Sequence, residues 1–529
     1  MPKDTATGSY CTTRSTGYLP YTMIVPAVTL VSLISSLPFG NTLFADDSRE
    51  RPNIILIFTD DQSHRSVGCY EESHPWVKTP HIDRLAAEGV RFTDAYAGTW
   101  CLPSRAMMLT GLHPHAIRGL NVVRNPTSKY DPSLCRFWPA ELRKAGYHTA
   151  LIGKWHLSPD AGHGRDWDHS VVWNHAVPKK AGGYYTNQKL NFDGGDYKAV
   201  GGYSTDNYTN YAEGYLKRDH KKPWFLWLCY DAVHSPYTPA KRHGSKYTGD
   251  EQVTTPKDIY PPRPTKPRYM HDYGVWKEGP DGVPVRGKTT LQQAVQKYNR
   301  AVLAIDEGVG RLLAVLKETG QLDNTLIVYT SDQGFAWGQH GFAWKVAPYD
   351  ANLRAPFIVR FPKRFARGKV CRHPVGALDL IPTFFALAET PLPWKMHGRD
   401  LSPILKNPEA PWPHPVMLEH FGWAFGEETD GGVTTKKAFS AVPWWLSVRD
   451  ERYKYIRTLV PNEVEELYNL ESDPEELHNL ALDPRHRELL VEYRRRLRDE
   501  LKRTDAELVK NLPRPKVTEQ SRGHPPPAP

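Results

Sequence analysis

The chain of 529 residues is poor in cysteine and has no long uninterrupted hydrophobic segment. Its six cysteines form neither a Cys-x-x-Cys zinc pair nor the dense framework of a small disulfide-stapled domain. No block of five or six like charges occurs, so we expect no polybasic arm and no nucleic-acid partner. There is no internal repeat, and no Gly-x-Ser-x-Gly turn surrounds Ser104, which argues against a serine nucleophile there.

The composition is typical of a globular protein. Hydrophobic residues make up 40% of the chain and charged residues 24%, with a mean hydropathy of −0.57. These values exclude a disordered, collagenous or multi-span membrane protein. The formal net charge of +9 favours anionic partners, and sulfated glycans, nucleic acids and acidic lipids all fit by charge alone.

The first 45 residues have the pattern of a secretory signal peptide. Lys3 and Arg14 precede an apolar run from Met23 to Phe39, and the small residue Ala45 stands just before an acidic pair. The run is shorter than the about 20 apolar residues that a membrane-spanning helix needs. We therefore predict a signal peptide at 1–45, export to the periplasm or the medium, and no stable membrane insertion. An uncleaved N-terminal anchor is the alternative.

Apolar segments of strand length alternate with helical segments along most of the chain. The predicted strands are residues 53–59, 148–153, 224–230, 326–330 and 356–361. Helices are expected at 138–145 and 290–319. This alternation predicts an α/β fold with a doubly wound sheet flanked by helices, which binds ligands at the carboxyl ends of its strands. Polar residues follow the predicted strands at those ends: Asp60, Lys154, Asp231 and Asp332.

Changes in pattern divide the chain further. Residues 46–410 are predicted to form the large N-terminal domain, 411–512 a smaller α+β subdomain, and the Pro-rich 513–529 a disordered tail. Two segments, about 160–222 and 236–289, are rich in Gly, Pro and aromatic residues and are interpreted as long insertions over the strand ends. Their aromatic residues are candidate platforms for sugar rings: Trp167, Trp173, Tyr184, Tyr185, Tyr203 and Trp276.

A cysteine motif carries the most specific signal. Cys101-Leu102-Pro103-Ser104-Arg105 is followed by Leu109-Thr110-Gly111, which matches the C-x-P-S-R…L-T-G signature of the sulfatases. Further matches follow the family's order: Asp60-Asp61-Gln62, Gly153-Lys154-Trp155-His156, His234-Ser235-Pro236-Tyr237, Ser331-Asp332-Gln333-Gly334, Trp344-Lys345 and Glu466-Leu467-Tyr468-Asn469-Leu470. The chain thus resembles the sulfatase family over essentially all of its mature length.

The resemblance implies an alkaline-phosphatase-like fold with a mixed sheet, and it makes 46–410 the catalytic domain. It also implies that a formylglycine-generating maturation enzyme converts Cys101 to formylglycine, whose hydrate supplies the nucleophile, while Arg105 holds the modified residue. Five cysteines remain after loss of Cys11 with the signal peptide, and conversion of Cys101 accounts for the odd number.

Further roles follow from the same resemblance. Lys154 and Lys345 would neutralise sulfate oxygens, His156 would deprotonate the hydrate, and His234 would protonate the leaving oxygen. These assignments suit the chemistry, because histidine titrates near neutrality and a sulfuryl group needs fixed positive charge. Four more histidines are weaker pocket candidates: His64, His113, His115 and His340.

The metal prediction combines chemistry with resemblance. Asp60, Asp61, Asp332 and Gln333 offer three carboxylates and one amide carbonyl, a set that suits Ca²⁺ or Mg²⁺ and disfavours zinc. The resemblance implies one Ca²⁺ ion, with the modified Cys101 among the ligands. Gln333 departs from the family, in which Asn or His is common at this position.

The predicted activity is hydrolysis of a sulfate ester, with a sulfated carbohydrate as the expected substrate. Two alternatives remain open at this stage. One is a phosphonate or phosphate ester hydrolase of the same superfamily, some members of which share the cysteine motif. The other is a catalytically silent glycan-binding homologue, in which Cys101 stays unmodified.

Overall fold

The structure is a computed structural model that describes residues 50–121, 129–431 and 440–516. The predicted signal peptide and residues 517–529 of the predicted tail lie outside these ranges. No described helix is long and apolar enough to cross a membrane.

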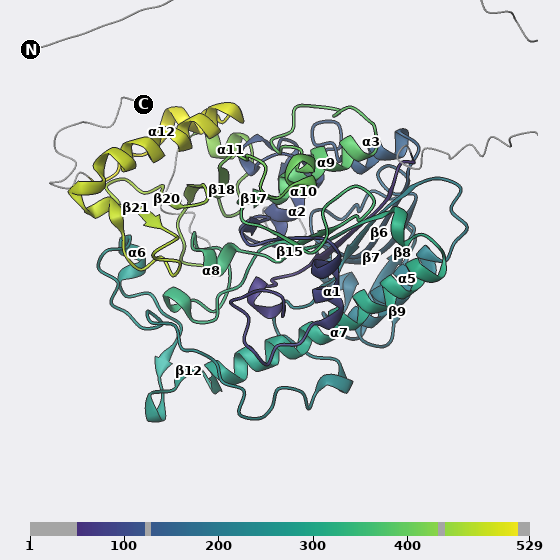
Figure 1. Cartoon of the computed structure of the whole chain (residues 1–529), viewed down its shortest axis with the longest axis horizontal. Coiled ribbons are helices and arrows are strands. Elements are labelled where there is room, and N and C mark those ends of the chain that lie inside the picture. The colour runs from purple at the N-terminus through teal and green to yellow at the C-terminus, as the bar shows by residue number, and fades with distance from the viewer. Residues whose placement is uncertain (1–49, 122–128, 432–439, 517–529) are drawn as a thin grey trace, which may run out of the picture. The chain divides into compact units, whose positions relative to one another are not determined.

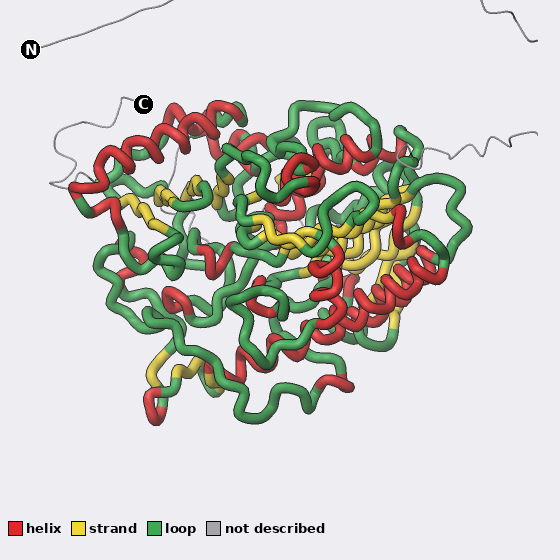
Figure 2. Tube along the Cα trace, viewed as in Figure 1, coloured by secondary structure: helices red, strands yellow, loops and turns green. Residues whose placement is uncertain are grey.

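A ten-stranded mixed sheet forms the centre of the fold, in the order β16-β2-β15-β14-β1-β10-β6-β7-β8-β9 (Figures 1 and 2). Its strands are β1 (Asn53–Thr59), β2 (Val90–Phe92), β6 (His148–Trp155), β7 (His169–Asn174), β8 (Gln188–Phe192), β9 (Tyr197–Val200), β10 (Trp224–Cys229), β14 (Thr325–Ser331), β15 (Phe357–Arg360) and β16 (Lys369–Cys371). The five central strands from β14 to β7 run parallel, and antiparallel neighbours flank them on both sides. The predicted α/β fold with a mixed sheet is confirmed.

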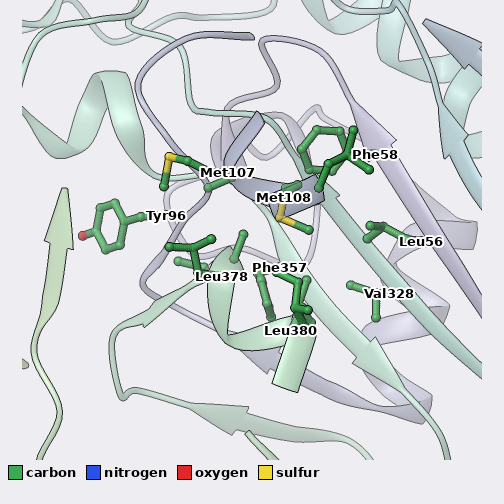
Figure 3. Close-up of a cluster of buried hydrophobic side chains, with 14 of the residues drawn as sticks. Leu56, Phe58, Tyr96, Met107, Met108, Val328, Phe357, Leu378 and Leu380 are labelled. Atoms are coloured by element: carbon green, nitrogen blue, oxygen red, sulfur yellow. The ribbon is translucent and has the colours of Figure 1, made fainter. Parts of the chain in front are cut away.

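Alternate side chains of the central strands enter two separate apolar layers, as the period of two along a strand requires. In β1, Leu56 and Phe58 belong to one layer, whereas Ile55 and Ile57 belong to the other. Figure 3 shows part of the first layer, where Leu56 and Phe58 lie in one cluster with Met107 and Met108. Burial on both faces explains why these strands are continuous hydrophobic runs.

Helices cover both faces of the sheet (Figure 1). One face packs against α1 (Pro80–Glu88), α5 (Ser204–Leu216) and α7 (Leu291–Glu318), and the other against α2 (Cys101–Thr110), α3 (Pro139–Lys144) and α9 (Leu380–Leu387). The long helix predicted at 290–319 is α7, whose first turn is closed by a capping box between Thr290 and Gln293. The short helices are α4 (Pro178–Ala181), α6 (Arg268–His271), α8 (Asp350–Leu353), α10 (Ser402–Lys406) and α11 (Glu427–Asp430).

The two predicted insertions differ in structure. The first was interpreted as a long insertion over the strand ends, but it contains β7, β8, β9 and α5, and so extends the central sheet. Short, polar edge strands joined by a Gly-rich turn hid this periodicity. The second carries a small antiparallel sheet of β11 (Lys277–Glu278), β12 (Pro284–Arg286) and β13 (Thr289–Thr290). Two further short pairs are β3 (Ala95–Tyr96) with β17 (Val375–Gly376) and β4 (Leu120–Asn121) with β5 (Lys129–Tyr130).

The C-terminal part forms a four-stranded antiparallel sheet of β18 (Val416–His420), β19 (Trp445–Arg449), β20 (Tyr453–Thr458) and β21 (Glu465–Asn469), packed against α12 (Arg487–Arg503). Trp445 and Ile456 of this sheet belong to the same apolar layer as Leu56. The C-terminal sheet thus packs with one face into the core of the central sheet and with the other against α12. Residues 513–516, which the sequence placed in the tail, are hydrogen-bonded to the chain near Asn462 and Glu463.

Gly153 is the residue of β6 that pairs with Cys229 of β10. Its φ of +111° is one that residues with a side chain rarely adopt. A Cβ added to Gly153 would lie 1.9 Å from the Cys229 carbonyl oxygen, so there is no room for a side chain. We expect Gly153→Ala to lower the free energy of unfolding by about 3 kcal/mol, because backbone must move. The matched control is Gly164→Ala, with a φ of +77° and no atom within 4 Å of the added Cβ. It should cost about 1–2 kcal/mol from backbone strain alone. Equal losses in urea titrations would contradict the steric argument.

Candidate active site

The parallel register of four strands assembles the site. In the order β14, β1, β10, β6, the strands pair Ser331 with Thr59, Phe58 with Cys229, and Cys229 with Gly153. Their carboxyl ends therefore lie side by side at one edge of the sheet, where α/β sheets bind ligands. The residues that follow these ends are Asp60 and Asp61 after β1, Asp332 and Gln333 after β14, Lys154 and His156 at the end of β6, and His234 after β10.

Cys101 reaches the same edge from helix α2. It is the first residue of this helix, which is buried along its whole length and ends at Gly111 in a left-handed cap with a φ of +72°. The final glycine of the L-T-G pattern thus has a structural role, since left-handed caps favour glycine. A cysteine at a helix N-terminus lies at the positive end of the helix dipole, which favours its thiolate.

Three carboxylates and the cysteine form one buried cluster. Side-chain ligand atoms of Asp60, Asp61, Cys101 and Asp332 all lie within 4.8 Å of one another, and each residue is at most 3% exposed. The Asp61 backbone N–H donates to Asp332 Oδ1 at 2.9 Å, and the Gln333 amide nitrogen donates to Asp61 Oδ1. The predicted metal-ligating residues are therefore brought together.

Three cations surround this cluster. Lys154 Nζ donates to Asp60 Oδ2, Lys345 Nζ lies against Asp61 Oδ1 and 3.2 Å from Cys101 Sγ, and Arg105 contacts Asp332 Oδ2 at 3.4 Å. Arg105 also donates to the Lys154 carbonyl oxygen at 3.2 Å. Because a buried charge is costly unless it is paired, these contacts are what allow three carboxylates to lie together.

The surroundings shift the pKa values of the acidic groups in the cluster in different directions. Burial alone would raise the pKa of the Cys101 thiol, but the charges of Lys154 and Lys345 outweigh burial and lower that pKa to about 6. Burial opposes ionisation of Asp60 too, yet Lys154 and His234 hold its pKa well below the ordinary value. Burial and the neighbouring charges of Asp60 and Cys101 raise the pKa of Asp332 well above its usual range.

Two ligand-type oxygens remain unsatisfied. Asp60 Oδ1 and Gln333 Oε1 are buried and have no hydrogen-bond partner among the described residues. Buried polar atoms are usually paired in proteins, so these two oxygens are available as ligands for a bound group. The oxygen-only chemistry of this set fits a hard divalent cation.

The two predicted catalytic histidines occupy different environments. His234 Nε2 lies 3.7 Å from Asp61 Oδ2, and this carboxylate overcomes burial and raises the pKa of His234. His156 is held by His175, with 2.8 Å between His175 Nδ1 and His156 Nε2. Burial together with Lys154 and Arg105 lowers the pKa of His156 well below its ordinary value, which favours the neutral ring. Its Nδ1 is buried without a partner among the described residues.

Sequence reasoning missed two residues of the site. The Tyr184 hydroxyl donates to Asp60 Oδ2 at 2.6 Å and accepts from Lys154 Nζ at 2.8 Å, and its ring stacks on His234 at 4.7 Å. The sequence pattern marks Tyr184 only as a candidate platform for a sugar ring and gives no signal for His175. Both come from the segment that lacked clear periodicity, so no spacing signal placed them at the site.

Several candidates lie elsewhere. Asp231 accepts hydrogen bonds from Ser204 and Gln188, each at 2.8 Å, outside the carboxylate cluster. The four weaker histidine candidates are engaged with other residues: His64 with Arg354, His113 with His397, His115 with Glu419 and His340 with Asp258. Most of the proposed sugar platforms are core residues at most 4% exposed: Trp167, Trp173, Tyr185 and Trp276.

Family models match most of the chain. The model described as Sulfatase covers residues 52–390, and the model described as N-sulphoglucosamine sulphohydrolase, C-terminal, covers residues 338–504. The chain belongs to the sulfatase family. It is therefore a sulfuric ester hydrolase, of a family that uses a metal ion and a modified cysteine.

Individual sulfatases are similar to this chain over most of its length. An N-acetylglucosamine-6-O-sulfatase of Bacteroides thetaiotaomicron is 28% identical over 512 residues, which cover 86% of this chain and 86% of the relative. A ulvan-active sulfatase of Formosa agariphila is 30% identical, covering 73% of this chain and 72% of the relative. A solved structure in complex with its substrate D-glucosamine-2-N,6-O-disulfate has a TM-score of 0.74 at 26% identity, covering 86% of this chain and 98% of that one.

The electrostatics of this sulfatase predict an acidic thiol. In metal-free protein with Cys101 unconverted, alkylation by iodoacetamide should rise with a midpoint near pH 6 instead of about 8.5, because Lys154 and Lys345 stabilise the thiolate. Lys345→Met should move the midpoint upward, since it removes the ammonium 3.2 Å from Sγ. Cys101→Ala protein serves as the blank for the other thiols. An unchanged midpoint in Lys345→Met would show that this lysine does not control the thiol.

Proposed function

We propose that this sulfatase hydrolyses a sulfate ester of a carbohydrate at Cys101, after conversion of this residue to formylglycine, with one Ca²⁺ ion bound beside it. One observation carries the proposal. The buried carboxylate cluster contains Cys101 and is in contact with three cations, and Asp60 Oδ1 within it and Gln333 Oε1 beside it have no hydrogen-bond partner in the described part of the chain. A site that binds and polarises a sulfuryl group needs this combination of a hard cation, fixed positive charge and a nucleophile.

The residues that would hold the ion are Asp60, Asp61, Asp332, Gln333 and the modified Cys101. Asp60 Oδ1 and Gln333 Oε1, which have no partner among the described residues, support this set. Although Gln333 departs from the family's usual Asn or His, its carbonyl oxygen can still act as a ligand. Oxygen donors of this kind favour Ca²⁺ over zinc, and flexible geometry favours Ca²⁺ over Mg²⁺. A bound cation would polarise a sulfate oxygen.

The cations of the site orient the ester. Lys154 and Lys345 are point charges paired with different carboxylates of the cluster, Asp60 and Asp61, and lysine suits the oxygens of a tetrahedral anion. Arg105 is 1% exposed and is held by Asp332 and the Lys154 carbonyl oxygen, so its charge has a fixed position one helical turn after residue 101. Formylglycine supplies the nucleophilic oxygen through its hydrate.

The histidines divide the proton transfers. Because His175 occupies His156 Nε2 and the lowered pKa favours the neutral ring, Nδ1 is the ring nitrogen left to accept a proton. His234 has a raised pKa and a side chain that is 25% exposed, so it can carry a proton to the leaving oxygen on the open side of the site. The surroundings raise the pKa of His234 and lower that of His156, as expected if His234 acts as the acid and His156 as the base.

Relatives support a carbohydrate substrate, since the similar sulfatases include one named for N-acetylglucosamine-6-O-sulfate and one active on ulvan. The net charge of +9 agrees with an anionic substrate. Export through the segment 1–45 and modification by a formylglycine-generating enzyme remain parts of the same proposal.

The conversion of Cys101 is tested by mass spectrometry of the peptide that contains it. Protein made with a maturation enzyme should show a loss of about 18 mass units, whereas ordinary cysteine oxidation adds oxygen. Cys101→Ala should abolish sulfate release and leave the unfolding curve nearly unchanged. An unshifted thiol in active protein would overturn the nucleophile assignment.

The reaction class is tested by comparing turnover of an aryl sulfate with turnover of an aryl phosphodiester. A preference of about tenfold for the aryl phosphodiester would favour the phosphorus-ester alternative.

The metal assignment is tested by calcium titration of Asp332→Asn. This change keeps the side-chain shape and removes one charge, so we expect the apparent calcium affinity to fall at least tenfold together with turnover. Asp231→Asn is the matched control, because Asp231 also follows a central strand but lies outside the cluster. Equal calcium affinity in wild-type and Asp332→Asn protein would remove Asp332 from the ligand set.

A further inference from the structure

The partly exposed residues show where the site opens. Among its charged groups, the side chains of His234 and Lys345 are 25% and 13% exposed, whereas Asp60, Lys154 and Asp332 are buried. A leaving group attached to a bound sulfate must therefore extend past His234 and Lys345. The small sheet of the second insertion places one arginine over the ring of Trp344, the chain neighbour of Lys345.

That residue is Arg286, the last residue of β12. Its guanidinium lies over the rings of Trp276 and Trp344, at 5.8 and 6.0 Å from their centroids. Trp344 is the chain neighbour of Lys345, and the Trp276 indole N–H donates to the Phe342 carbonyl oxygen at 3.0 Å. The insertion is thus attached to the same loop that carries Lys345, and Arg286 is part of this attachment.

The charge of Arg286 acts on the open side of the site. Burial raises the pKa of the Tyr237 phenol to about 12, with Asp61 raising it and Arg286 and Lys345 lowering it. Tyr237 follows His234 by three residues and its ring packs near Tyr298, whose hydroxyl bonds the Asp61 carbonyl oxygen. Arg286 and Lys345 therefore face one tyrosine beside the metal-ligating carboxylates.

Arg286 lacks a countercharge. No carboxylate forms an ion pair with it in the described part of the chain, and it is half-buried. Other half-buried arginines near the sheet are paired, such as Arg354 with Glu72 and Asp94. An arginine fixed on two indoles and left without a carboxylate presents its N–H groups for an external anion, and guanidinium binds sulfate and carboxylate oxygens in a bidentate manner.

We propose that Arg286 binds a second oxyanion of the substrate, a sulfate or a carboxylate on the same saccharide, while the first sulfate occupies the site at Cys101. This inference rests on the proposed function and narrows it to saccharides with at least two anionic groups. Arg286 is a specificity residue for the leaving group and does not touch the reacting atoms.

The test uses three sugars. D-Glucosamine-2-N,6-O-disulfate carries a second sulfate, a disaccharide of glucuronate and 6-sulfated N-acetylglucosamine carries a carboxylate, and N-acetylglucosamine-6-O-sulfate carries neither. Calorimetry with calcium-loaded Cys101→Ala protein measures their binding, and sulfate release by the mature protein measures kcat/KM. We expect one anionic sugar to bind at least tenfold more tightly than the monosulfate, and the preferred sugar identifies the source of the oxyanion.

Arg286→Gln should abolish this preference by weakening binding of the anionic sugar about tenfold, mainly through KM in turnover, and should leave the monosulfate within about twofold. Arg286→Lys should keep part of the preference. Lys288→Gln is the matched control, because Lys288 is exposed on the same small hairpin and carries the same charge. An equal loss for all sugars in Arg286→Gln, or the same loss in Lys288→Gln, would overturn the proposal.

Failure of the two proposals can be told apart. If the mature protein releases no sulfate from any sugar while the Cys101→Ala protein still shows the Arg286-dependent preference, the proposed reaction is wrong and Arg286 still recognises an oxyanion. If sulfate is released from all three sugars without preference, the sulfatase assignment stands and the role of Arg286 is overturned.

Discussion

The structure of the site depends on positive groups that balance the negative charge of three carboxylates buried at one edge of the parallel strands. Asp60, Asp61 and Asp332 are at most 2% exposed, and carboxylates so buried are stable only with opposite charge nearby. Lys154, Lys345 and Arg105 supply part of that charge through direct contacts. Burial and the charges of Asp60 and Cys101 raise the pKa of Asp332, and two oxygens lack partners among the described residues, so a further positive charge would be stabilised here.

The sheet determines where these groups meet. Four parallel strands end in register, and their next residues are necessarily neighbours. Gly153 allows β6 to approach β10 closely just before Lys154, and a side chain there would collide with the β10 backbone. Helix α2 then brings Cys101 to the same edge with its N-terminus directed at the carboxylates. The catalytic arrangement is therefore a property of strand register and helix placement, with the insertions adding the residues at its opening.

Much of this arrangement follows from local sequence. The strands before Asp60 and Asp332 are continuous apolar runs, and strand ends in a doubly wound fold converge, so their polar successors could be placed together without a structure. The C-x-P-S-R motif has a fixed spacing, so it assigned both Cys101 and Arg105 to the site from the sequence. Helix α7 was predictable because its apolar period is regular over many turns.

The rest could not be predicted from local pattern. Tyr184 and His175 lie in a segment of short polar edge strands, and their contacts with Lys154 and His156 join residues 19 to 30 positions apart through tertiary packing. The aromatic residues of the insertions looked like sugar platforms, yet most fill the core, since composition cannot distinguish an exposed ring from a buried one. Arg286 likewise depends on how a small hairpin packs against a distant loop.

A crystal structure of the calcium-loaded protein, with anomalous scattering measured for the ion, tests the central claim most directly. The account predicts one calcium peak bonded to Asp60 Oδ1 and Gln333 Oε1, with Asp61 and Asp332 completing an oxygen shell beside residue 101. Absence of a peak there at saturating calcium, with both oxygens instead paired to protein groups or water, would contradict it.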